Sequence, residues 1–201
     1  ATPPVVKNII IANCVELLAT TLLPTGEELI ARFALFNVES SFFHSYQIFT
    51  YMFLHGGLMH ILWNMFALYL FGRIFLDFFS VRHFVGVYLL GGLFGALFFV
   101  LAYNLFPYFA AVVDVSHLVG ASAAVLAVVT AAAVRSPEYR INMLFFGSIK
   151  LSTFAIVTVC ISVLMLSGNN AGGNFAHLGG ALGGYLFALL LGKGFDLTDI
   201  L

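Results

Sequence analysis

Polar residues that can carry out acyl-transfer chemistry lie inside long apolar stretches of this chain. They are Ser122, His177 and the pair His60 and Asn64. Hydrocarbon penalises polar side chains, so those found at membrane depth usually serve a function. A serine, histidines and an asparagine can supply a nucleophile, a base and donors to an oxyanion. The sequence therefore predicts an acyl-transfer site, provided that the stretches meet in space.

The composition indicates an integral membrane protein. Of its 201 residues, 62% are hydrophobic and only 8% are charged, whereas an average soluble domain is about 25% charged. The formal net charge of -1 comes without any basic stripe, which argues against a nucleic-acid partner. The expected surroundings are a lipid bilayer, and the composition sets no oligomeric state.

Six stretches are long and apolar enough to form membrane helices, which require about 20 residues each. They cover residues 5–23, 58–79, 83–105, 115–134, 147–167 and 173–192. We therefore expect an all-α polytopic membrane protein, with one domain over residues 1–201. Its two cysteines, Cys14 and Cys160, fall in different spans and are expected to be buried, inert thiols.

Positive charges are distributed unevenly between the two ends of these spans. The first, third and fifth connections hold only Arg32, while the termini and the other connections hold Lys7, Arg73, Arg82, Arg135, Arg140, Lys150 and Lys193. By the positive-inside rule, both termini are expected in the cytoplasm. The first connection, residues 24–53, is too long for a bare loop. Its mixture of apolar and charged residues near 27–36 predicts a short amphipathic helix in the outer interface, the alternative being a poorly ordered loop.

The candidate residues are expected to share one layer near the outer surface. His60 and Asn64 are four residues apart and so lie on one helical face. Ser122 is about seven residues into its expected span, and His177 about five into its own, which gives similar depths. Small residues at 120–124 and 179–184 allow the helices to approach closely. We therefore predict a hydrogen bond between Ser122 and His177.

Each residue also has a structural explanation. An isolated serine often bonds its own helix, His177 could be a packing histidine, and Asn64 could bond a neighbouring helix. A local triad of Asp114, His117 and Ser122 is conceivable, although His117 lies on another face from Ser122. A metal site is not expected, because the histidine spacings are not those of a closed site and no carboxylate or cysteine shares the layer.

Three motifs follow one another along the chain: His55-Gly-Gly-Leu-Met-His60-Ile-Leu-Trp-Asn64, Gly120-Ala-Ser122 and Ala176-His177-Leu-Gly-Gly180-Ala-Leu-Gly-Gly184. Taken in this order, they resemble those of the rhomboid family of intramembrane serine proteases. The resemblance covers nearly the whole chain as a bacterial six-helix core, with the long first connection similar to the family's membrane-embedded loop and Ser167–Phe175 similar to its mobile cap. It implies a bacterial inner (plasma) membrane and an active site open to the outer side.

The resemblance implies a role for each site residue. Ser122 would be the nucleophile and His177 the base, while the Ser122 N–H, His60 and Asn64 would form the oxyanion hole. His55 matches the family's structural histidine. The implied reaction is hydrolysis of a peptide bond in or near the outer end of a substrate protein's transmembrane helix, by a Ser–His dyad and without a cofactor.

The chain departs from the family pattern at three places. Ala123 follows the serine where the family has glycine, Leu126 stands where a tyrosine often stacks on the histidine, and Tyr46-Gln47 replaces Trp-Arg. We expect the added methyl to crowd the His177 ring and slow the enzyme. The first two changes also favour an alternative, a weak or inactive rhomboid-like protein that binds membrane helices. A small transporter or channel is a further alternative, although the sequence has no internal repeat.

Overall fold

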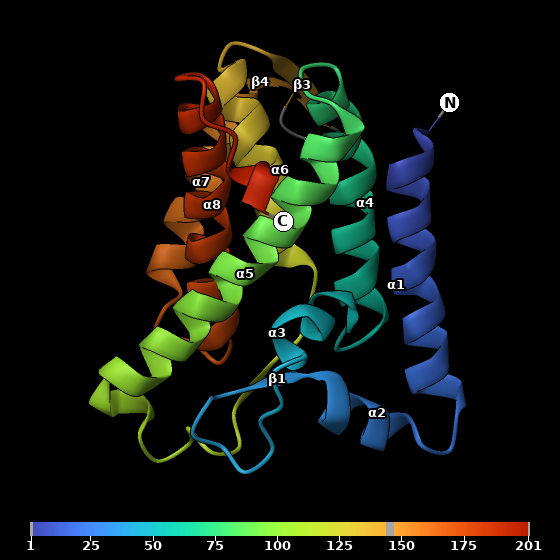
Figure 1. Cartoon of the computed structure of the whole chain (residues 1–201), viewed down its shortest axis with the longest axis vertical. Coiled ribbons are helices and arrows are strands. Elements are labelled where there is room, and N and C mark those ends of the chain that lie inside the picture. Colours follow the sequence, from blue (N-terminus) through green and yellow to red (C-terminus); the bar gives the residue numbers. More distant parts are fainter. Residues whose placement is uncertain (1, 144–146, 201) are drawn as a thin grey trace.

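The computed structural model describes residues 2–143 and 147–200, and within them the chain is mostly helical (Figure 1). Among these described residues, four helices are long and apolar enough to cross a membrane: α1 (Pro4–Leu22), α4 (Leu58–Leu76), α5 (Val81–Leu105) and α8 (Ala171–Leu191). Two further apolar helices, α6 (Ser122–Arg135) and α7 (Leu151–Leu164), are shorter, with 14 residues each. The protein is therefore an integral membrane protein built as a helical bundle.

Two of the six predicted spans begin later than expected. α6 begins at Ser122 and not near residue 115, because strand β2 (His117–Leu118) and Gly120, with a φ of 127°, precede it. α7 begins at Leu151, after the antiparallel strands β3 (Arg140–Met143) and β4 (Gly147–Lys150). A 14-residue helix is only about 21 Å long, against about 30 Å for the hydrocarbon core. α6 therefore begins part-way along the bundle (Figure 1).

The first connection is ordered, and the predicted amphipathic helix is confirmed as α2 (Gly26–Phe33). Strand β1 (Leu35–Phe36) follows, then α3 (Gln47–Thr50) and the short 3-10 helix η1 (Tyr51–Phe53). β1 pairs with β2, with Leu35 opposite Leu118. The connection is thereby joined to the segment that leads into α6.

Gln47 organises the interior of this connection. It is fully buried, and its Nε2 donates to the carbonyls of Arg32 and Phe42, each at 3.0 Å. Its Oε1 accepts from the N–H groups of Phe36 at 3.4 Å and His44 at 3.1 Å. Both amide protons and both acceptor positions are used, so the hydrogen-bonding capacity of this buried glutamine is fully satisfied.

Small residues let α8 contact α6 backbone to backbone. A Cβ added at Gly180 would lie 2.1 Å from the Ala123 carbonyl oxygen, and one at Gly184 would lie 2.1 Å from that of Ala127. Gly179 makes an equivalent contact with the backbone of α5. The predicted small-residue face of the last helix is confirmed, and it fixes how closely the two helices can hold their side chains.

The two cysteines are free and exposed on the outside of the bundle. The expected burial of Cys14 and Cys160 was wrong. α1 and α7 are peripheral helices, and an apolar helix in a membrane can turn a thiol toward lipid as readily as toward protein.

Replacing Gly180 with alanine tests the helix contact. The new methyl group would have to push α8 away from the Ala123 carbonyl, and such overpacking costs about 1–3 kcal/mol or more. We expect Gly180→Ala to lower the thermal unfolding temperature in detergent. Gly192→Ala is the control, because its Cβ would meet only its own helix at 3.4 Å. Equal unfolding temperatures for the two variants would contradict this packing.

Candidate active site

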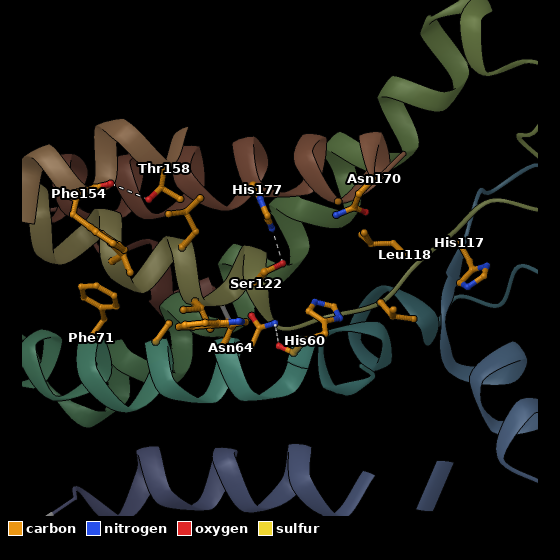
Figure 2. Close-up of a pocket in the computed structure, with 17 residues that line it drawn as sticks. His60, Asn64, Phe71, His117, Leu118, Ser122, Phe154, Thr158, Asn170 and His177 are labelled. Carbon is orange, nitrogen blue, oxygen red and sulfur yellow. Dashed lines mark hydrogen bonds between the residues drawn. The ribbon is translucent and has the colours of Figure 1, made fainter. Parts of the chain in front are cut away.

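Ser122 and His177 meet across the contact between α6 and α8. Ser122 Oγ lies 2.8 Å from His177 Nε2, and Figure 2 shows the two side chains pointing toward one another. That distance suits a nucleophile and its base, which require about 2.6–3.2 Å. The depth estimate placed Ser122 inside a span, whereas it is the first residue of α6. The extended segment that contains β2 carries the chain to the depth at which Ser122 and His177 meet.

The position of Ser122 at a helix start makes its N–H available. The first N–H groups of a helix have no carbonyl partner within it and carry a partial positive charge. Gly120 shapes the turn before the helix with its positive φ, and its N–H donates to the Tyr51 carbonyl at 3.0 Å. A Cβ at Gly120 would lie 2.8 Å from Cε1 of His60. Glycine is therefore required there by both backbone conformation and space.

His60 and Asn64 face Ser122 from α4 (Figure 2). The Gly56 N–H donates to His60 Nδ1 at 3.2 Å, so in the neutral ring the proton is on Nε2. A Cβ at Gly120 would lie 2.9 Å from that Nε2, which places it beside the segment leading to Ser122. Asn64 Nδ2 donates to the His60 carbonyl at 2.9 Å, and its second proton remains for the cavity.

His55 supports the turn before α4. It is buried, its Nδ1 is 3.2 Å from the Phe53 carbonyl, and its ring packs edge-on against His60. Burial, assisted by the neighbouring His60, lowers the pKa of His55 to about 4. The His55 ring is therefore neutral near pH 7 and adds no charge beside His60.

These side chains line one cavity of about 520 Å³. Its polar end holds Ser122, His177, His60 and Asn64, and its other end is apolar and lies between α4, α6 and α7 (Figure 2). Apolar lining residues include Phe71, Val125, Leu126, Val129 and Phe154. The cavity can thus hold a chain segment with both a polar group and apolar side chains.

The segment expected as a cap, Ser167–Phe175, is partly helical. α8 begins at Ala171, so only residues 167–170 form turns and bends. Asn170 lines the cavity. Asn174 donates to the Met165 carbonyl at 3.0 Å and ties the turn to the end of α7.

The local triad of Asp114, His117 and Ser122 does not form. His117 is exposed on β2 and lies to the side of the Ser122–His177 pair (Figure 2). Asp114 instead holds the first connection: its carbonyl accepts from Ser40 Oγ at 2.7 Å and its carboxylate from the Ser41 N–H at 3.3 Å. The four residues between His117 and Ser122 pass from a strand through a turn, which separates the two side chains.

Sequence reasoning missed Ser162 of α7. Its side chain is buried, with Oγ 3.2 Å from His177 Nδ1. The same Oγ donates to the Thr158 carbonyl at 3.1 Å. A serine in an apolar span usually bonds only its own helix, so no motif marked Ser162. Its proximity to His177 depends on how α7 packs against α8.

The methyl group of Ala123 packs toward α5. A Cβ added at Gly95 would lie 2.6 Å from the Ala123 Cβ, so the methyl occupies space that Gly95 leaves open. The Ser122–His177 hydrogen bond is present with alanine in place. That the methyl slows the reaction stays a prediction.

The fold defines a helical integral membrane protein with a serine–histidine pair in a cavity between its helices. A family model described as the rhomboid domain matches residues 43–194, which include α3 through α8. The chain belongs to the rhomboid family. A search among curated proteins gave no match.

Proposed function

We propose that this protein is an intramembrane serine endopeptidase that cleaves substrate proteins in or near the outer end of a transmembrane helix. The observation that carries the proposal is the 2.8 Å contact between Ser122 Oγ and His177 Nε2 at the wall of a cavity shared with His60 and Asn64. Membership of a family whose members are typically serine peptidases supports it.

In the first step, His177 Nε2 accepts the Ser122 hydroxyl proton while Oγ attacks the scissile carbonyl carbon. The oxyanion that forms is stabilised by the Ser122 N–H, the His60 Nε2–H and the free Asn64 Nδ2–H. The partial positive charge at the start of α6 acts in the same direction. Fixed donors of this kind are effective because they need no reorganisation as charge develops.

The tetrahedral intermediate then collapses, and His177 gives its proton to the leaving amine. An acyl-enzyme remains on Ser122. Water attacks its carbonyl with His177 again acting as base, which releases the acid product and restores the serine. The cavity of about 520 Å³ has room for this water beside the bound chain.

The substrate must present an unwound peptide bond, because helical carbonyls are already hydrogen-bonded and shielded. Small or helix-breaking residues near the outer end of its transmembrane helix lower the cost of unwinding. The apolar end of the cavity would hold side chains that follow or precede the cleaved bond.

In this proposal all six apolar helices, α1 and α4 to α8, cross the membrane with both termini in the cytoplasm. The end of the bundle that carries the start of α1, the β3–β4 hairpin and the end of α8 (Figure 1) holds seven of the eight Lys and Arg residues. Arg32 lies in α2 at the opposite end. The site then opens to the outer side.

Cysteine labelling tests the orientation. In a background with Cys14→Ser and Cys160→Ser, a cysteine at the exposed position 108 should react with an impermeant maleimide on intact cells. A cysteine at position 193 should react only after permeabilisation. The reverse pattern would contradict the orientation.

Loss of the proposed dyad should abolish cleavage. We expect Ser122→Ala and His177→Ala each to stop hydrolysis of a model membrane-helix substrate without changing the unfolding temperature greatly. Asn64→Ala removes one donor and should lower kcat by about a hundredfold. His44→Ala, which alters an exposed histidine of the first connection, is the control and should retain activity. Unchanged cleavage by either dyad variant would rule out the mechanism.

A further inference from the structure

We infer that Ser162 is a positioning residue, which holds the His177 ring in the tautomer and orientation that the base requires. The effect of this positioning on catalysis rests on the proposed function. Ser162 belongs to α7, while the two residues that it would serve lie on α6 and α8. Three helices therefore contribute to one chain of hydrogen bonds.

The protons of that chain can be assigned from the partners. A serine hydroxyl has one proton, and that of Ser162 is donated to the Thr158 carbonyl, which can only accept. Ser162 Oγ must then accept at its 3.2 Å contact with His177, so Nδ1 carries the ring proton. Nε2 is consequently unprotonated and accepts from Ser122 at 2.8 Å. That is the tautomer of a base ready to act.

No other contact in the described site assigns the ring proton in this way. Among the described residues that line the cavity, none is a carboxylate, and Leu126 cannot stack on the imidazole as an aromatic side chain would. Ser162 is only 2% exposed, so water does not compete readily for its oxygen. A buried hydroxyl thus supplies the acceptor that a carboxylate supplies in a serine–histidine–aspartate triad.

The contact strengthens when the base works. Once His177 has taken the Ser122 proton, the Nδ1–H···Ser162 hydrogen bond has a charged donor, and charge-assisted bonds are stronger than neutral ones. Ser162 does not line the cavity and so does not touch substrate. Its removal should therefore lower kcat and leave KM unchanged.

Kinetics of three variants test this assignment. We expect Ser162→Ala to lower kcat by about 10- to 100-fold, the effect of losing one hydrogen bond to a charged group, with KM unchanged. Ser162→Thr keeps the hydroxyl and should restore most of kcat. The control is Ser152→Ala in the same helix, which removes a hydroxyl whose one hydrogen bond among the described residues is to the Pro137 carbonyl at 2.8 Å. Wild-type kcat in Ser162→Ala would overturn the inference, and so would an equal loss in Ser152→Ala.

Nitrogen NMR of histidine-labelled protein gives a second readout that needs no activity. In the wild type, the His177 signals, assigned by their loss in His177→Asn, should show a protonated Nδ1 and an unprotonated Nε2. Ser162→Ala should give a mixture of the two His177 tautomers. If Ser162→Thr folds poorly, the comparison of wild-type and Ser162→Ala spectra still tests whether Ser162 fixes the tautomer. The Nδ1–H form persisting in Ser162→Ala would overturn the inference. The expected spectra from a wild type that cleaves nothing would support the positioning and refute the proposed function.

Discussion

The geometry of the site depends on one close contact, in which α8 lies directly against the backbone of α6. Any side chain at Gly180 would collide with the Ala123 carbonyl. Because the backbones touch there, His177 can reach Ser122 at 2.8 Å from a neighbouring helix. Ser–His bonding between helices requires such proximity, and small residues are how membrane helices achieve it without a hydrophobic driving force. Packing and chemistry are therefore properties of the same glycine-rich face.

The second constraint is the length of α6. A helix of 14 residues is shorter than the long apolar helices beside it, and extended chain leads to its start. That chain is held by β1, by the Tyr51 carbonyl and, less directly, by the buried Gln47 network of the first connection. The helix start, with its free N–H groups and partial positive charge, consequently lies at the cavity and not at the bundle end. The long first connection thus acts as the scaffold for the segment that carries Ser122.

The sequence alone predicted the membrane class, the helices and the meeting of Ser122 with His177, because hydropathy and residue spacing report directly on burial and helical faces. It could not locate the start of α6, since the residues Val115–Val119, three apolar ones with Ser116 and His117 between them, suit either a helix or an extended segment. It also missed the contact of Ser162 with His177 and the packing of the Ala123 methyl group against Gly95, because both depend on how separate helices pack. Hydropathy likewise cannot distinguish a thiol exposed on the outside of the bundle, such as Cys160, from one that packs against protein.

The proposed function depends on the activation of Ser122 as a nucleophile by His177. A fluorophosphonate probe measures this directly, since it reacts covalently with an activated serine and needs no knowledge of the substrate. We predict one adduct, located by mass spectrometry on the peptide containing Ser122, absent in Ser122→Ala and formed much more slowly in His177→Ala. An unlabelled Ser122 in folded protein, or labelling at the same rate without His177, would contradict the account.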